Sequence, residues 1–151
     1  MSELSHVDAN GKAHMVDVGA KEIVHRYASA SGKILLSTHG LSQIKANQLK
    51  KGDALATAKI AGIMAAKQTS NLIPLCHPLL LDHIDLELVI TADGVEVTSH
   101  IETTARTGVE MEALTAVSVA LLTIYDMCKA VDKTMVIQSV QLIKKTKTPL
   151  L

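Results

Sequence analysis

A β-hairpin is encoded in the segment Ile84-Asp-Leu-Glu-Leu-Val-Ile-Thr-Ala-Asp-Gly-Val-Glu-Val-Thr-Ser-His-Ile101. Apolar residues alternate with acidic ones after Ile84, a period typical of a strand with one buried face. Asp93-Gly94 is a strong hairpin turn, and apolar residues alternate again on the return strand that follows it. The segment therefore predicts two adjacent antiparallel strands.

The elements expected on either side of this hairpin complete an α+β fold. Before it, we expect a strand over residues 21–36, a short helix over about 41–49, and an Ala-rich helix from its N-cap Asp53 to about residue 71. Two prolines make residues 72–78 a loop. After the hairpin, we expect a helix over about 108–130 and a strand over about 135–143. This order predicts a ferredoxin-like split βαβ sandwich, in which helices cover one face of an antiparallel sheet.

Length and composition indicate a single domain over residues 1–151. Hydrophobic residues make up 48% of the chain, which is enough for one buried core. The 15 Lys and Arg residues balance the 15 Asp and Glu residues, so no overall field attracts nucleic acid or a membrane. The chain has no Phe, no Trp and only two Tyr residues. This scarcity disfavours single-stranded nucleic-acid binding, which uses aromatic side chains to stack bases.

The sequence favours a soluble cytoplasmic protein. Its two cysteines, Cys76 and Cys128, are too few for the disulfide framework of a small secreted domain. Residues 1–6 have neither a basic start nor an apolar core, so we expect no secretory signal. The apolar run Ala113–Tyr125 is shorter than the roughly 20 residues that span a bilayer.

The helix expected over residues 108–130 is apolar on every side in its middle, as in a helix buried all round. One sheet face cannot cover such a helix, so packing against another subunit is expected. Asp126 and Lys129 lie one turn apart at the end expected to be buried, with Glu112 about 40° off the same line. Buried charges are costly unless they are paired or used. The alternative is a plain ion pair on a solvated helix end.

His77 lies in the loop over residues 72–78 and has several possible roles. The candidate roles are those of a base, an anion-binding group, a metal ligand together with Cys76, and a structural residue of a loop shaped by prolines. The metal interpretation is the weakest, because the sequence has neither a CxxC pair nor an HExxH helix to supply further ligands.

Three lysines recur every eight residues, at Lys51, Lys59 and Lys67. Such a pattern usually describes a solvated helix face. Lys51 also precedes the N-terminus of a predicted helix, where free amides favour anions, so a phosphate-binding role is the alternative. The sequence has no GxxxxGK[ST] loop, and nucleotide hydrolysis of the P-loop type is not expected.

Several segments match one known family in order and spacing. They are His14-Met-Val-Asp-Val18, residues 51–67, Leu72-Ile-Pro-Leu-Cys-His-Pro78, and residues 106–116 continuing through 125–131, and together they cover about residues 5–143. On these segments the chain resembles the molybdenum cofactor biosynthesis protein C family, the cyclic pyranopterin monophosphate synthases. The tail departs from the family's Gly-rich end, since it reads Lys145-Thr-Lys-Thr-Pro-Leu-Leu151. We therefore leave Lys145 and Lys147 outside the expected site.

The resemblance implies a phosphorus-oxygen lyase that acts on a small-molecule cyclic nucleoside triphosphate. This enzyme converts (8S)-3',8-cyclo-7,8-dihydroguanosine 5'-triphosphate to cyclic pyranopterin monophosphate and releases pyrophosphate. The resemblance also implies a homohexamer, a trimer of dimers, with sites at subunit junctions. We expect no cofactor and no metal. The implied site residues are Asp126 as catalytic acid or base with Lys51 and Lys129 beside it, and Leu75, Cys76, His77, Lys67, Glu110, Met111 and Glu112 as substrate-binding residues.

Two other classes of function compete with the synthase. A non-catalytic ligand-binding module of ferredoxin-like shape would keep its binding after Asp126→Asn, whereas an enzyme would lose turnover. An RNA-binding domain on the same scaffold is disfavoured by the two tyrosines and the balanced charge.

Overall fold

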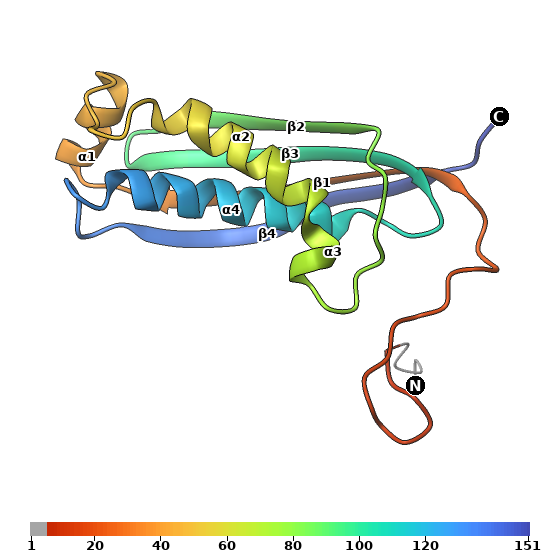
Figure 1. Ribbon diagram of the computed structural model, residues 1–151. Helices are drawn as coiled ribbons and strands as arrows, with labels where there is room; N and C mark the ends of the chain where they lie inside the picture. The colour runs from red at the N-terminus through yellow and green to blue at the C-terminus, as the bar shows by residue number, and fades with distance from the viewer. Residues whose placement is uncertain (1–5) are drawn as a thin grey trace.

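The structure, a computed structural model, describes residues 6–151, in which four strands form one antiparallel sheet (Figure 1). The strands are β1 (Val24–Leu35), β2 (His83–Ile90), β3 (Gly94–Ala105) and β4 (Val136–Thr148). Their order across the sheet is β2-β3-β1-β4. The expected domain span of 1–151 and the expected lack of a secretory signal also concern residues 1–5, which lie outside the described residues.

Two long helices, α2 (Ala54–Lys67) and α4 (Glu110–Cys128), cover one face of the sheet and leave the other face open (Figure 1). The short helix α1 (Thr38–Lys45) lies beyond one end of the sheet, and α3 (Thr69–Leu72) follows α2 directly. The strand order and the single helical layer confirm the predicted ferredoxin-like split βαβ arrangement.

The predicted hairpin joins β2 to β3. Ile90 is paired with Val95, and the Thr91 amide donates to the Gly94 carbonyl at 2.9 Å. A Cβ atom on Gly94 would collide with the carbonyl of Ile34 on β1. Gly94 is therefore needed because β1 passes so close to the turn, whereas its backbone stays outside the left-handed region.

Glycines allow the helices to lie close to each other and to the sheet. A Cβ atom on Gly62, in the middle of α2, would lie 2.9 Å from the Ala116 carbonyl oxygen of α4. On β1, a Cβ atom at Gly32 would lie 2.8 Å from Leu121 and 2.9 Å from Val117, both on α4. A core without Phe or Trp therefore stays dense, because the layers approach so closely.

The predicted boundaries need corrections, and the short helix, expected to end near residue 49, already ends at Lys45. β1 begins at Val24, three residues later than predicted, and β4 continues to Thr148 because its end pairs with the start of β1. The short helix begins at Thr38, since Ser37 caps it by accepting from the Gly40 amide at 3.0 Å. The Ala-rich helix begins after the predicted cap Asp53, which accepts from the Ala56 amide, but it ends at Lys67, and the separate turn α3 follows.

The long helix α4 is a core helix. In the described part of the chain it is the one helix whose length and hydropathy would allow a membrane span, and 56% of its apolar window is buried inside the fold. The single chain does not cover α4 all round, since Leu122 is 58% exposed and Tyr125 is 38% exposed, and the expected packing against another subunit stays a prediction. Ile60 and Met64 of α2 are also largely exposed. The helical layer therefore presents apolar side chains on its outer side.

Candidate active site

Lys51, Asp126 and Lys129 form one group of contacts, which we call the charged cluster. The Lys51 ammonium donates to Asp126 Oδ2 at 2.6 Å and to the Asp126 backbone carbonyl at 3.2 Å. The Lys129 ammonium lies 2.8 Å from Asp126 Oδ1. Each oxygen of one carboxylate thus holds one ammonium group, although the three residues come from two distant parts of the chain.

The charged cluster lies at the surface of the single chain. The side chains of Lys51, Asp126 and Lys129 are 49%, 53% and 56% exposed. Within one chain Asp126 and Lys129 are not buried, because the described residues cover only the side of the last turn that carries Met127 and Cys128. Their burial at a subunit junction stays a prediction. The i,i+3 ion pair, which was the alternative interpretation, is present.

The two lysines keep Asp126 ionised. Hydrogen bonds from Lys129 and then from Lys51 lower the pKa of Asp126 to about 2. The same bond to Asp126 raises the pKa of Lys129 above its ordinary value. At neutral pH the cluster is therefore an anion held between two cations, with a net positive charge that suits a phosphate group.

The turn before α2 carries Lys51 to this position. Gly52 has φ of +94°, in the left-handed region that favours glycine. Its amide donates to the Leu49 carbonyl at 3.0 Å, and the Leu49 side chain is buried in the core. Asp53 then caps α2. The Lys51 backbone is consequently fixed on both sides by local structure.

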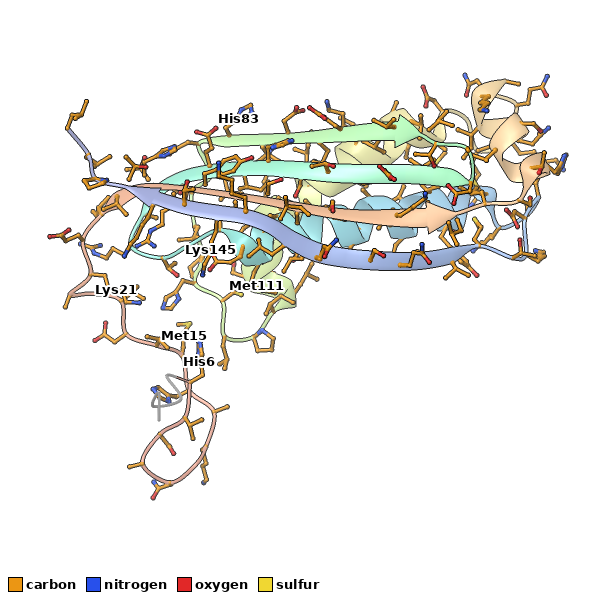
Figure 2. The ribbon with its side chains drawn as sticks, turned by 180° about the vertical axis from the view of Figure 1, so that it is seen from behind. His6, Met15, Lys21, His83, Met111 and Lys145 are labelled. Carbon is orange, nitrogen blue, oxygen red and sulfur yellow. The ribbon has the colours of Figure 1, made fainter. Side chains whose placement is uncertain are left out.

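A pocket of about 320 Å³ lies at the opposite end of α4, and we call it the α4 pocket. Its walls are the segment before β1, the loop after α3 and the first turn of α4. Figure 2 shows Met111 of α4 on the same side of the molecule as His6, Met15 and Lys21 of the segment before β1. The lining residues are His6, Val16, Val18, Lys21, Leu75, Cys76, His77, Leu79, Thr107, Gly108, Glu110, Met111 and Glu112.

His77 is oriented by the segment before β1. Its Nε2 lies 2.7 Å from the backbone carbonyl oxygen of Val16. A carbonyl oxygen only accepts hydrogen bonds, so Nε2 carries the proton and the neutral ring keeps an acceptor at Nδ1. With this tautomer, the Nδ1 atom of His77 can accept one hydrogen bond from a ligand in the pocket.

Glu112 is a buried carboxyl group in the wall of the α4 pocket. Its residue is only 4% exposed. Burial, with a smaller contribution from the charge of Glu110, raises the pKa of Glu112 to about 7. Burial also raises the pKa of the Cys76 thiol, and the two carboxylates add to that effect. Near neutral pH, Glu112 can therefore either hold or release a proton.

The structure brings together most of the expected substrate-binding residues and separates them from the expected catalytic ones. Six of the seven line the α4 pocket, and Lys67 does not. Lys67 is the last residue of α2. It lies at the same end of the helix pair as the α4 pocket, because α2 and α4 run in opposite directions. Glu112 and Asp126 are fourteen residues apart, about 21 Å along the helix at 1.5 Å per residue. Within one chain, the pocket and the charged cluster do not meet.

Several residues near the α4 pocket escaped the sequence analysis. Val16 and Val18 lie in a matching segment but carry no reactive group, and Lys21 was assigned to a strand. Lys145 was left out because of the unusual tail, yet its ammonium lies 3.1 Å from Glu110 Oε1. Its proximity was not predictable, since the sequence indicated an end of the last strand near residue 143.

The remaining candidates behave as surface or structural groups. Lys59 lies 2.9 Å from Asp85 on β2, which matches the solvated-face interpretation. Among residues 6–151, no group of three or more His, Cys, Asp and Glu side chains is placed to hold a metal ion. Cys76 and His77 therefore gain no further ligands from the described part of the chain.

Comparison with known proteins places the chain in a family. Residues 15–148 match the MoaC family. A cyclic pyranopterin monophosphate synthase of Novosphingobium aromaticivorans is 56% identical over 145 residues, which cover 96% of this chain and 92% of the relative. Proteins of the same name from Desulfitobacterium hafniense and Roseiflexus castenholzii are 55% and 53% identical, covering 95% and 97% of this chain and 89% and 94% of the relatives. The chain therefore belongs to the MoaC family.

Proposed function

We propose that this chain is a cyclic pyranopterin monophosphate synthase of molybdenum cofactor biosynthesis. It converts (8S)-3',8-cyclo-7,8-dihydroguanosine 5'-triphosphate to cyclic pyranopterin monophosphate and releases pyrophosphate. The observation that carries the proposal is the match to the MoaC family over residues 15–148. Relatives named cyclic pyranopterin monophosphate synthase are also more than half identical to this chain over almost its whole length. The α4 pocket and the charged cluster supply groups that this reaction needs.

The α4 pocket suits the ring system of the substrate. Its polar groups include His77, which can accept a hydrogen bond, and the carboxyl groups of Glu110 and Glu112. Purine and pterin rings present N–H groups along one edge, which such acceptors bind. Opening one ring and closing another requires proton transfers, and a carboxyl group with a pKa of about 7, as in Glu112, can take part near neutral pH. Leu75, Cys76 and Met111 supply the apolar wall.

The charged cluster suits the phosphate chemistry. Formation of the cyclic phosphate needs the triphosphate held in place and the charge on the leaving pyrophosphate neutralised. Lys51 and Lys129 provide two ammonium groups on either side of one carboxylate. Asp126, which stays ionised, holds them in position and can accept a proton from a reacting hydroxyl group. Lys67 adds a further positive charge at the other end of the helix pair.

A complete site then requires two copies of the chain. The pocket and the cluster lie at opposite ends of α4, and a second copy in the opposite direction would place its cluster beside the first copy's pocket. The exposed apolar side chains of Ile60, Met64 and Leu122 on the helical layer give such a contact a surface to bury. We propose a homohexamer, a trimer of dimers, in the cytoplasm, with no nucleic-acid or membrane partner.

A subunit-mixing experiment tests both the activity and the shared site. Asp126→Asn and His77→Ala are each expected to abolish pyrophosphate release from the cyclic triphosphate while the fold survives. Unfolding and reassembling an equal mixture of the two variants should restore about a quarter of the wild-type sites, because half of the dimers then contain one intact site. Asp93→Asn, in the exposed turn between β2 and β3, is the matched control and should keep full activity. An inactive wild-type protein would contradict the enzyme, and an inactive mixture would contradict the shared site.

A further inference from the structure

Asp132 is a buried carboxylate that the proposed chemistry does not use. It lies just past the end of α4 and is 3% exposed. Its Oδ2 accepts from the Ser37 amide at 2.6 Å, and its Oδ1 accepts from the amide and the hydroxyl group of Thr134 at 2.9 and 2.8 Å. Burial raises the pKa of Asp132, but these hydrogen bonds outweigh it and hold the pKa below its ordinary value. The group is therefore an ionised, fully bonded carboxylate.

This carboxylate fixes the first turn of α1. Ser37 is the N-cap of α1, so Asp132 accepts at the end of the helix where free amides favour a negative charge. Gly40 leaves just enough room for the contact, since a Cβ atom there would lie 2.8 Å from Asp132 Oδ2. Among the described contacts, no residue of α1 itself makes a side-chain hydrogen bond to the end of α4.

The chain from Ser37 to Lys51 is thus attached to the end of α4 at two points, and we call it the α1 bracket. At its start, Ser37 bonds to Asp132, and at its end, Lys51 bonds to Asp126. Figure 1 shows α1 beside the C-terminal end of α4, away from the long strands. A displacement of the bracket that carries the turn over residues 49–52 with it therefore moves the Lys51 backbone relative to Asp126.

The two attachments differ in strength. Lys51 and Asp126 are about half exposed, and ion pairs in such positions contribute little to stability because water and salt screen them. The bond from Ser37 to Asp132 is part-buried, with its charged acceptor only 3% exposed, which makes it the stronger and more directional tie. The apolar contacts of Leu41 and Ile44 also hold α1, but they do not set its direction.

We propose that Asp132 is a positioning residue, which holds the α1 bracket on α4 and thereby keeps Lys51 against Asp126. The inference rests on the function proposed above for its effect on turnover, but its effect on geometry is independent of that function. A displacement of about 1 Å in a catalytic group can cost up to a hundredfold in rate.

The test compares Asp132→Asn with the wild type. The Asn side chain keeps the shape, but an amide cannot accept on both sides, so either Ser37 or Thr134 loses its partner. We expect the pKa of the Asp126 carboxyl, followed by NMR, to rise from about 2 part of the way towards its ordinary value of 3.8. We also expect kcat/KM to fall by about tenfold or more. In a Lys51→Ala background, the Asp132→Asn change should reduce the remaining activity no further.

Two further variants keep the test decisive. Gly40→Ala pushes against Asp132 Oδ2 without changing any charge, so it should raise the pKa of Asp126 in the same direction and serves if Asp132→Asn does not fold. Thr134→Ala removes one hydroxyl bond but leaves the bond from Ser37, so the pKa of Asp126 should stay unchanged.

The outcomes separate this inference from the proposed function. An unchanged Asp126 pKa in folded Asp132→Asn and Gly40→Ala proteins would overturn the positioning role, and so would an equal loss of activity with and without Lys51. If the wild type releases no pyrophosphate, the proposed function fails, while the NMR titration still decides whether Asp132 positions Lys51.

Discussion

The contact between α2 and α4 at Gly62 offers a test of how the core is packed. We expect Gly62→Ala to destabilise the protein, although alanine is normally the better residue in a helix. The new methyl group would collide with Leu86 Cδ2 of β2 and lie 2.9 Å from the backbone carbonyl oxygen of Ala116. The Leu86 side chain can turn away, but the Ala116 carbonyl belongs to α4 and can move only if the whole helix does.

The expected loss follows from two opposing contributions. Replacing glycine by alanine in a helix gains about 1 kcal/mol of helix propensity. Forcing an extra methyl group into a packed core costs about 1–3 kcal/mol, and a backbone contact puts Gly62→Ala at the upper end. The net loss is therefore about 2 kcal/mol, which corresponds to a fall of roughly 4–8 °C in Tm for a domain of this size.

Denaturant unfolding at one protein concentration compares the variants with the contribution of subunit association held constant. Leu86→Val gives the matched comparison, because it removes the Cδ atoms that the new methyl group would meet. The double variant Gly62→Ala/Leu86→Val should then be more stable than the sum of the two single losses predicts. A Gly62→Ala protein as stable as the wild type, or strictly additive losses, would refute the close approach of α2 to α4 and β2.

Three shorter predictions concern other groups. The Glu112→Gln variant should become more stable relative to the wild type as the pH rises from 5 to 8. In the folded wild type the pKa of Glu112 is about 7, above its ordinary value of 4.5. The stability that protonated Glu112 gives the wild type is therefore fully present below pH 4.5 and is lost as the pH rises through 7. A pH-independent difference in unfolding free energy would contradict this. Asp53→Ala removes the cap of α2 and should cost about 1 kcal/mol in thermal unfolding, against no loss for Glu87→Gln on the exposed side of β2. Iodoacetamide at pH 8 should modify Cys76 alone in mass spectra, because Cys128 is fully buried and burial raises the pKa of its thiol to about 11.

Much of the fold could be predicted because its determinants are local. Alternation after Ile84 and the Asp93-Gly94 turn define the hairpin, and Asp53 marks the start of α2. The start of α1 was missed because Ser37-Thr38-His39-Gly40 has the composition of a break, and the carboxylate that favours a helix there comes from residue 132. Such a long-range contact has no periodic signature in the sequence.

The site was predicted as a set of residues but not as an arrangement. The matching segments identify the members of the α4 pocket and of the charged cluster, and helical periodicity places Glu112 and Asp126 near one line along α4. Periodicity says nothing about which line is covered, so the exposure of Asp126 followed only from the structure. The segment with Val16, which closes the pocket, has no regular structure and therefore no pattern to read.

The straight helix α4 has a consequence for how this protein can vary. Inserting or deleting a single residue between Glu112 and Asp126 would turn everything beyond it by about 100° and shift it by 1.5 Å. The carboxylate of Asp126 would then face away from the Lys51 ammonium, even if the core repacked. The number of residues between these two acidic residues is thus fixed by the geometry of the helix, and insertions are expected only in connections that do not pack against the sheet.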